Sequence, residues 1–177
     1  MVKHWIRTSL FLLALLLSVA VSALAFRSPI AALAAQEAPA EPTVIPVELA
    51  ARALGVEGAR ICKTLAFQHK DGGCILICAA GDGKVSNRGF KAYFGFKPKM
   101  MGHDQTAEMT GHAVGGVCPF ALPETVQVYC DESLRRFETV FPAAGSSNSA
   151  VEMTPEELYA ISGAKAWVTV CDLPGAE

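Results

Sequence analysis

The segment Thr110-Gly-His-Ala-Val-Gly-Gly-Val-Cys-Pro-Phe-Ala-Leu122 sets two adjacent glycines and a proline around a turn without an obvious catalytic side chain. Gly115 and Gly116 can adopt positive φ and allow a close approach to the main chain, whereas Pro119 fixes its own φ and lacks an N–H. The segment therefore predicts a rigid loop whose remaining N–H groups can point at a carbonyl or an oxyanion. An ordinary tight turn is the alternative.

Short helices and strands are expected on both sides of this loop. The patterns predict helices at 47–55, 86–95, 104–109 and from 154 onward, and strands at 60–67, 74–79, 126–130, 138–141, 150–153 and 166–171. Ser86 or Asn87 and Thr154 are expected to cap their helices, and the composition of 69–73 is typical of a hairpin turn. Strands interspersed with helices, without regular βαβ alternation, predict an α+β fold around a mixed sheet.

The first 43 residues differ in composition from the rest. Two basic residues and a histidine precede an uncharged run at 8–26 that is rich in leucine and alanine, with a small-x-small pattern at 23–25. We expect residues 1–26 to be a secretory signal or a membrane anchor, the latter associating with a membrane through residues 8–26. Residues 27–43 are expected to be a linker. A buried apolar helix and a start assigned too far upstream are the alternatives.

The six cysteines include no Cys-x-x-C pair, so the sequence gives little support for a zinc site. Cys74 and Cys78 lie on one predicted strand about 13 Å apart, which is too far for a disulfide. Most of the cysteines lie among Val, Ile and Leu. We therefore expect buried free thiols, which favour a reducing compartment over export.

The net charge of the chain is −2, and residues 45–177 hold 12 Lys and Arg against 15 Asp and Glu. This balance excludes a uniformly basic nucleic-acid binder. A local basic patch is nevertheless predicted, because no acid lies between Asp82 and Asp104. Its cations are Lys84, Arg88, Lys91, Lys97 and Lys99. A solvated helix face is the alternative.

Four segments carry a resemblance to a known family. They are Glu48-Leu-Ala-Ala-Arg-Ala-Leu-Gly55, Ile61-Cys-Lys-Thr-Leu65, Thr110-Gly-His-Ala-Val-Gly-Gly-Val-Cys-Pro-Phe120 and Gly145-Ser-Ser-Asn-Ser149. Over roughly residues 44–172 the chain resembles the YbaK family of aminoacyl-tRNA deacylases, which includes the editing domain inserted in bacterial prolyl-tRNA synthetases. The resemblance implies a curved, partly barrel-like mixed sheet with short flanking helices at 44–172, followed by a tail at 173–177.

The resemblance also implies an activity. Editing enzymes of this kind hydrolyse the ester between an amino acid and the terminal adenosine of tRNA, helped by the neighbouring ribose hydroxyl. The expected substrate is a mischarged tRNA for proline or a similar small amino acid, and no metal or organic cofactor is expected. Expected partners are aminoacyl-tRNA and an aminoacyl-tRNA synthetase, but not DNA. This function predicts a cytoplasmic protein, whereas residues 1–26 predict export or anchoring, and both stay open.

Site residues follow from the same resemblance. Lys63 would hold a phosphate or polar group of the terminal adenosine as a point charge, and the N–H groups of residues 115–118 would stabilise the oxyanion. Catalytic candidates are Lys63, Gly115, Gly116, Val117, Cys118 and Pro119. Substrate-binding candidates are Thr110, His112, Asp131, Ser146, Ser147 and Asn148. The candidates for binding tRNA are Lys84, Arg88, Lys91, Lys97 and Lys99. A turn-capping role for Asp131 and a plain turn at 145–149 are the alternatives.

Two alternative functions are also compatible with the sequence. Family members begin with a helix and a strand ahead of the Glu48 helix, and neither is recognisable here, which motivates a non-catalytic alternative. Such a protein would bind tRNA or an aminoacyl adenosine, or would be an exported interaction domain. The other alternative is a thiol hydrolase in which His112 activates Cys118. Relatives that carry serine at the Cys118 position make a thiol mechanism the weaker of the two.

Overall fold

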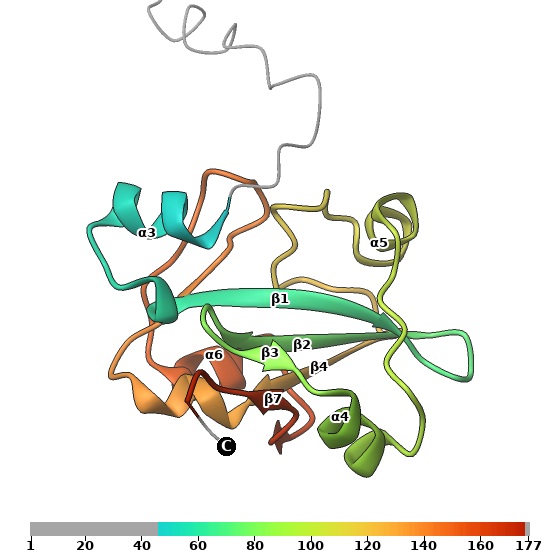
Figure 1. Ribbon diagram of the computed structural model, residues 1–177. Coiled ribbons are helices and arrows are strands. Elements are labelled where there is room, and N and C mark those ends of the chain that lie inside the picture. Colours follow the sequence, from blue (N-terminus) through green and yellow to red (C-terminus); the bar gives the residue numbers. More distant parts are fainter. Residues whose placement is uncertain (1–45, 176–177) are drawn as a thin grey trace, which may run out of the picture. The chain divides into compact units, whose positions relative to one another are not determined.

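A long antiparallel hairpin lies at the centre of the fold and consists of β1 (Ile61–Gln68) and β2 (Cys74–Ala80) (Figure 1). The computed structural model describes residues 46–175. The hairpin turn is closed by a hydrogen bond from the His69 N–H to the Gly73 carbonyl at 2.9 Å. Gly72 holds a φ of 90° in this turn, a conformation that favours glycine. The predicted hairpin is therefore confirmed.

The main sheet is mixed, in the order β5-β1-β2-β4-β6. The strands β4 (Val126–Asp131), β5 (Phe141–Pro142) and β6 (Trp167–Val168) run parallel to their neighbours β2, β1 and β4, respectively. A second sheet pairs β3 (Lys84–Val85) with β7 (Cys171–Asp172). A mixed five-stranded sheet with short helices confirms the predicted α+β fold.

Three predicted strands are shorter or differently placed. The strand expected at 166–171 divides into β6 and β7, which belong to different sheets. Asp131 explains the division, since its carboxylate accepts the N–H groups of Val170 and Cys171, which therefore do not continue the ladder of β6. The strands expected at 138–141 and 150–153 reduce to β5 and isolated bridges.

The helices lie close to the predicted positions. They are α3 (Val47–Leu54), α4 (Asn87–Phe94), α5 (His103–Thr110) and α6 (Pro155–Ser162), with short 3₁₀ segments η1 (Gly58–Arg60) and η2 (Glu132–Arg136). The helices α3 and α4 end at the predicted glycines, Gly55 and Gly95. Ser86 caps α4 by accepting the Gly89 N–H at 3.4 Å. Thr154 and Glu157 form a capping box at α6. Each of these four α-helices within residues 46–175 ends at a glycine with positive φ.

Both faces of the main sheet are buried, which explains the nearly continuous apolar sequence of β2. Leu76 and Cys78 face one hydrophobic cluster, together with Leu158 of α6. Ile75 and Ile77 face the other, together with Phe90 of α4. The alternation along β2 therefore packs helices against both sides of the sheet.

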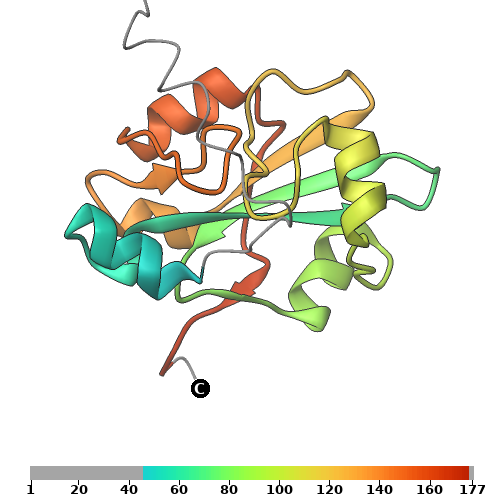
Figure 2. The same cartoon turned by 90° about the horizontal axis from the view of Figure 1, so that it is seen from above.

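The β1 edge of the sheet is only partly covered by another strand, because β5 pairs with no more of β1 than Ile61 and Cys62. Viewed from above, β1 runs between α3 and α5, and two loops cross the space between these helices (Figure 2). We call residues 111–122 the glycine loop and residues 143–150 the serine loop. This edge is where the candidate site lies.

The predicted signal or anchor at 1–26 and the linker at 27–43 lie outside the described residues, as does the end of the predicted tail. Within residues 46–175, none of the helices has the length and apolar character needed to cross a membrane. All six cysteines are free thiols. Five are buried and Cys171 is partly exposed, which confirms the predicted buried thiols.

Candidate active site

The glycine loop opens with a tight turn, closed by a hydrogen bond from the Gly116 N–H to the Ala113 carbonyl at 3.0 Å. Gly115 holds a φ of 97° at the third position of this turn, where type II turns require glycine. Positive φ is therefore confirmed for Gly115 but is wrong for Gly116. The turn also engages the Gly116 N–H, so this amide cannot donate to an oxyanion as the sequence suggested.

Gly116 is needed for a different reason, which is close contact with the serine loop. A Cβ atom added there would lie 2.8 Å from both Cα and the carbonyl carbon of Ser146 and 3.0 Å from its nitrogen. Real Cβ atoms do not approach main-chain atoms so closely. The two loops therefore pack main chain against main chain, with no space for a side chain at this position.

Among residues 115–118, three main-chain amides remain free. The N–H groups of Gly115, Val117 and Cys118 have no hydrogen-bond acceptor within residues 46–175. Pro119, which follows them, has no N–H to satisfy. Buried main-chain donors are nearly always paired. The free amides are therefore available to a ligand, and two of them, in Gly115 and Val117, belong to residues that line a cavity.

This cavity, of about 430 Å³, lies along the open edge of β1. We call it the edge cavity. The helix α3, the glycine loop, the serine loop and the segment that leads into α5 all contribute to its wall. Its polar lining residues are Lys63, Thr64, His103, Thr106, Ser146, Ser147 and Ser149. Much of the remaining wall is apolar and includes Leu54, Met101, Val117 and Phe141. Such a lining suits a small apolar group that is held by a few polar contacts.

Lys63 lies on β1 and points to the sheet face that it shares with Leu65 and Phe67. Its Nζ donates a hydrogen bond to the Gly83 carbonyl at 2.5 Å. Burial lowers the pKa of Lys63, while the Asp82 carboxylate acts in the opposite direction. Lys63 lines the edge cavity and also a neighbouring groove of about 380 Å³. The lysine therefore lies where the two spaces meet.

Thr64 lines the edge cavity, and its main-chain N–H and C=O groups also face this side of β1. The Ala66 carbonyl accepts the Met101 N–H at 2.9 Å, and Gln68 donates to the Lys99 carbonyl at 2.8 Å, both on the outer side of β1. Main-chain groups alternate sides along a strand, so those of Thr64 also face outward. The Thr64 hydroxyl is buried without a hydrogen-bond partner among the described residues. Thr64 thus offers an unpaired donor and acceptor at the edge cavity.

The serine loop holds itself in shape through its own side chains. The Ser146 hydroxyl lies 2.8 Å from both Asn148 Oδ1 and Ser149 Oγ, and the Ser146 N–H donates to Ser149 Oγ at 3.2 Å. Ser147 lines the edge cavity, and its hydroxyl makes no hydrogen bond within the part of the chain that is described. Asn148 does not line this cavity. Ser147 is therefore the free hydroxyl of the loop.

Thr110 and Asp131, two of the predicted substrate ligands, do not line the edge cavity and are engaged in contacts within the fold. Asp131 is buried, and its carboxylate accepts hydrogen bonds from the main-chain N–H groups of Ser133, Val170 and Cys171 at 2.9 to 3.1 Å. Thr110 donates to the Thr106 carbonyl at 2.7 Å and accepts the His112 N–H at 3.1 Å. These contacts give Asp131 and Thr110 a structural role.

His112 and Cys118 meet in the glycine loop, where Nε2 of the histidine lies 3.5 Å from the sulfur. This is the pairing that the thiol hydrolase would need. Neither residue lines the edge cavity, however, and Cys118 is only 5% exposed. A substrate in the cavity would therefore meet main-chain groups before it met the thiol.

We predict that Cys118→Ser will keep the deacylase rate of the wild-type protein within about threefold. The hydroxyl fills nearly the same space and is a far weaker nucleophile than a thiolate, so the variant separates packing from covalent catalysis. The measurement is single-turnover hydrolysis of aminoacyl-tRNA. Loss of activity with normal thermal stability would instead favour the thiol hydrolase.

The predicted basic patch is exposed and spans three segments. It is made of Lys84 on β3, Arg88 and Lys91 on α4, and Lys97 and Lys99 in the following loop. None of these five forms an ion pair with a carboxylate in residues 46–175. Lys84 also lines the groove beside Lys63. The structure therefore connects the patch to the edge cavity through this groove.

Several lining residues were missed in the sequence. The apolar side chains of α3 and the pair Met100 and Met101 have the pattern of core residues, and only the folded chain brings them to the edge cavity. His103 was interpreted as part of a turn, and Thr106 as an ordinary position of a helix. Within the described residues, no three His, Cys, Asp or Glu side chains are grouped as metal ligands would be.

The family model of the aminoacyl-tRNA editing domain matches residues 41–161, and the chain belongs to this family. It is 50% identical over 125 residues to the uncharacterized protein YwhH of Bacillus subtilis, covering 71% of this chain and 80% of the relative.

Two further relatives carry functional names. A proposed Cys-tRNA(Pro)/Cys-tRNA(Cys) deacylase of Enterococcus faecalis, EbsC, is 25% identical over 116 residues, covering 65% of this chain and 71% of the relative. The crystal structure of a proposed trans-editing enzyme for prolyl tRNA synthetase superposes with a TM-score of 0.63 and 28% identity. That match covers 73% of this chain and 80% of the other. The predicted family is therefore confirmed, and it supports an aminoacyl-tRNA deacylase in general.

Proposed function

We propose that this protein is a trans-editing hydrolase that cleaves the ester of misacylated aminoacyl-tRNA. Its substrate is a mischarged tRNA for proline or for a similar small amino acid. One observation carries the proposal: a single cavity brings together Lys63, the free amides of Gly115 and Val117, and the unbonded hydroxyl of Ser147. These groups come from three distant parts of the chain and suit a charged, polar ester.

The chemistry assigned to these groups is electrostatic. The oxygen of a water molecule attacks the acyl carbon, and the carbonyl oxygen becomes an oxyanion that the amides of Gly115 and Val117 stabilise. The neighbouring ribose hydroxyl positions or activates this water. The ester bond then breaks, the ribose oxygen leaves with a proton, and the free amino acid departs. Lys63 holds the terminal adenosine as a fixed positive charge.

Recognition of the amino acid falls to the apolar wall and to Thr64. Met101, Val117 and Phe141 limit the size of the side chain that the cavity accepts. The outward carbonyl of Thr64 is suited to accept a hydrogen bond from the ammonium group that every aminoacyl ester carries. The names of the two functionally described relatives support a tRNA for proline. One methylene changes binding by only about 1–3 kcal/mol, so alanine and cysteine esters need direct comparison.

The test is a panel of purified aminoacyl-tRNAs that includes alanyl- and cysteinyl-tRNA for proline, with correctly charged prolyl-tRNA as the control. We expect the protein to release amino acid from at least one mischarged tRNA faster than buffer does. Correctly charged prolyl-tRNA should be hydrolysed no faster than in buffer. Binding of tRNA without hydrolysis would support the non-catalytic alternative. No turnover on any member of the panel would exclude the hydrolase.

We also predict a steep dependence on salt. If the five cations of the basic patch contact phosphates, raising the salt from 50 to 200 mM should lower kcat/KM by roughly 10²- to 10³-fold. Neutralising two of them, in Arg88→Gln with Lys91→Gln, should reduce the salt slope by about two. The matched control is Lys165→Gln, which neutralises an exposed lysine outside the patch. Equal slopes in all three proteins would exclude the patch as the tRNA contact.

A further inference from the structure

The turn between β2 and β3 supplies the carbonyl that holds Lys63. The Gly83 N–H donates to the Ala80 carbonyl at 3.0 Å, which closes the turn, and the Gly83 carbonyl accepts the Lys63 ammonium. Gly81 fixes the turn from the other side, because a Cβ atom there would lie 2.0 Å from the Gly58 carbonyl oxygen. The position of the lysine head group therefore depends on how firmly this turn is held.

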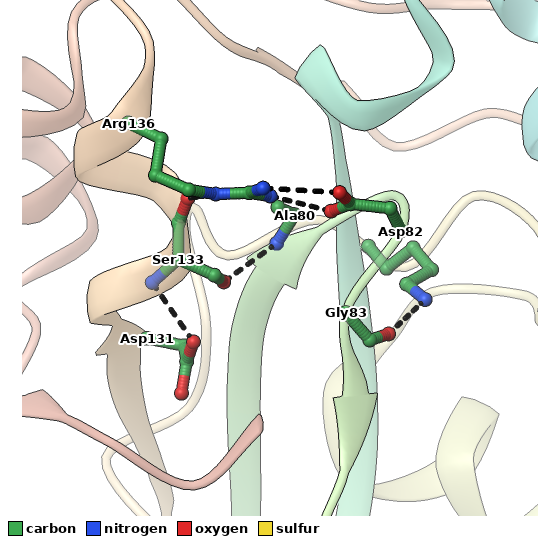
Figure 3. Close-up of polar contacts among 7 residues, drawn as sticks. Ala80, Asp82, Gly83, Asp131, Ser133 and Arg136 are labelled. Carbon is green, nitrogen blue, oxygen red and sulfur yellow. Dashed lines mark hydrogen bonds and ion pairs between the residues drawn. The ribbon is translucent and has the colours of Figure 1, made fainter. Parts of the chain in front are cut away.

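Asp82, in the middle of the turn, is held by a bidentate ion pair. Arg136 Nη2 lies 2.5 Å from Oδ1 and Nη1 lies 3.1 Å from Oδ2, so both oxygens of the carboxylate are engaged (Figure 3). Hydrogen bonding to Arg136 is the largest cause that lowers the pKa of Asp82. A planar guanidinium that faces a carboxylate in this way fixes direction as well as distance.

The arginine is itself anchored to the sheet. Its Nε donates to the Ser133 carbonyl at 2.9 Å, and its guanidinium lies 4.8 Å from the ring centroid of Phe137. Ser133 accepts the Ala80 N–H at 3.2 Å and donates its own N–H to Asp131, so η2 is joined to the ends of both β2 and β4 (Figure 3). A chain of contacts thus runs from the buried sheet through Arg136 to the turn.

We propose that the Asp82–Arg136 ion pair positions Lys63, by fixing the turn whose Gly83 carbonyl holds the lysine ammonium where the edge cavity meets the neighbouring groove. Neither Asp82 nor Arg136 lines the edge cavity. Both are therefore positioning residues that act through Gly83. The inference rests on the proposed function, because it assigns a support to the lysine of that site.

The groups around Lys63 show how the Asp82 carboxylate affects the pKa of the lysine. Four titratable groups act on the ammonium: Asp82 in the turn, Cys171 on β7, Lys84 on β3 and Glu48 on α3. Lys84 lowers the pKa of Lys63, and the other three raise it. Loss of the Asp82 charge therefore leaves the burial of Lys63 less well compensated, so the pKa of Lys63 should fall.

The first experiment compares Asp82→Asn, Arg136→Gln and the double variant in single-turnover and steady-state deacylation. Each single variant should lower kcat roughly 10-fold with little change in KM, because small displacements of a catalytic group have effects of this size. The double variant should be no slower than the slower single variant, since both break one contact. The matched control is Glu132→Gln, which removes a carboxylate from the same η2 segment, where it pairs with Arg135 at 3.2 Å.

The second experiment is independent of catalysis. NMR titration of the lysine ¹³Cε resonances, with Lys63 assigned from its loss in Lys63→Arg, follows the ammonium in the wild-type protein and in each variant. The pKa of Lys63 should fall in Asp82→Asn and stay unchanged in Glu132→Gln. Unchanged titration together with wild-type kcat in Asp82→Asn would overturn the proposal. If the wild-type protein hydrolyses no aminoacyl-tRNA, the proposed function has failed, and the titration alone tests whether Asp82 acts on Lys63.

Discussion

Replacing Lys63 by alanine should lower the single-turnover rate of deacylation by roughly 10²- to 10³-fold, the range found when one preorganised electrostatic contact is removed. Lys63 is half-buried, and its ammonium is fixed on the Gly83 carbonyl. A water molecule that fills the space left by the side chain would not replace this fixed positive charge. The control is Lys70→Ala, which removes an exposed lysine from the β1–β2 turn, away from the edge cavity. Wild-type rates in Lys63→Ala would remove the residue from the site.

The same lysine should set an alkaline limit on activity. Burial is the largest cause of its lowered pKa, so the ammonium loses its proton at a lower pH than an ordinary lysine does. If the charged form is required, kcat should fall as the pH rises through the pKa of Lys63. At pH values below this pKa, the protonation of Lys63 should not limit kcat. Lys63→Arg, whose side chain stays charged, should lose this alkaline limb even if its absolute rate is low. A limb that persists in this variant would have another origin.

Replacing Gly116 by alanine should have the second largest effect. The new methyl group would meet the main chain of Ser146 at 2.8 Å, and rotation cannot relieve this contact because the position of a Cβ atom is fixed by its own backbone. We expect a loss of stability of about 1–3 kcal/mol, typical of overpacking. Separation of the two loops would also displace the Gly115 and Val117 amides, so deacylation should fall by roughly 10²-fold.

Thermal denaturation and single-turnover kinetics test this prediction together. The control is Gly102→Ala, because an added Cβ there meets no atom within 4 Å and the φ of −71° suits alanine. Gly102→Ala should keep the wild-type rate and nearly all of the stability. A Gly116→Ala protein that matches this control in both measurements would show that the contact between the loops is dispensable.

Local chemistry explains which parts of the fold could be predicted from the sequence. Helix ends such as Ser86 and Thr154 were predicted correctly because capping depends on residues within one turn. The strand at 166–171 was not, because its division is caused by Asp131, some 40 residues earlier in the chain. A carboxylate that accepts distant main-chain N–H groups leaves no periodic pattern in the sequence.

The candidate site divides in the same way. The glycine loop and Lys63 could be identified because their residue types and order match a family, yet the sequence could not show that Gly116 uses its N–H inside the turn. The wall from α3 was missed because apolar helical residues have one pattern whether they face a core or a cavity. Asp131 was assigned to the substrate from the family resemblance, with turn capping as the alternative, and the sequence could not show its distant main-chain partners Val170 and Cys171.

The open edge at Thr64 and the free amides of the glycine loop are main-chain groups, whereas the size of the edge cavity is set by side chains. In the proposed function, binding of the ester and selection of the amino acid therefore depend on different parts of the protein. Peptide N–H and C=O groups are the same whatever side chain is attached, so in the proposed function a substitution of Thr64 or Val117 leaves the main-chain contacts to the shared part of every aminoacyl ester in place. Side chains such as Met101 and Phe141 can meanwhile change the amino acid that fits. A scaffold of this kind can acquire a new substrate preference through a few apolar replacements without rebuilding its chemistry.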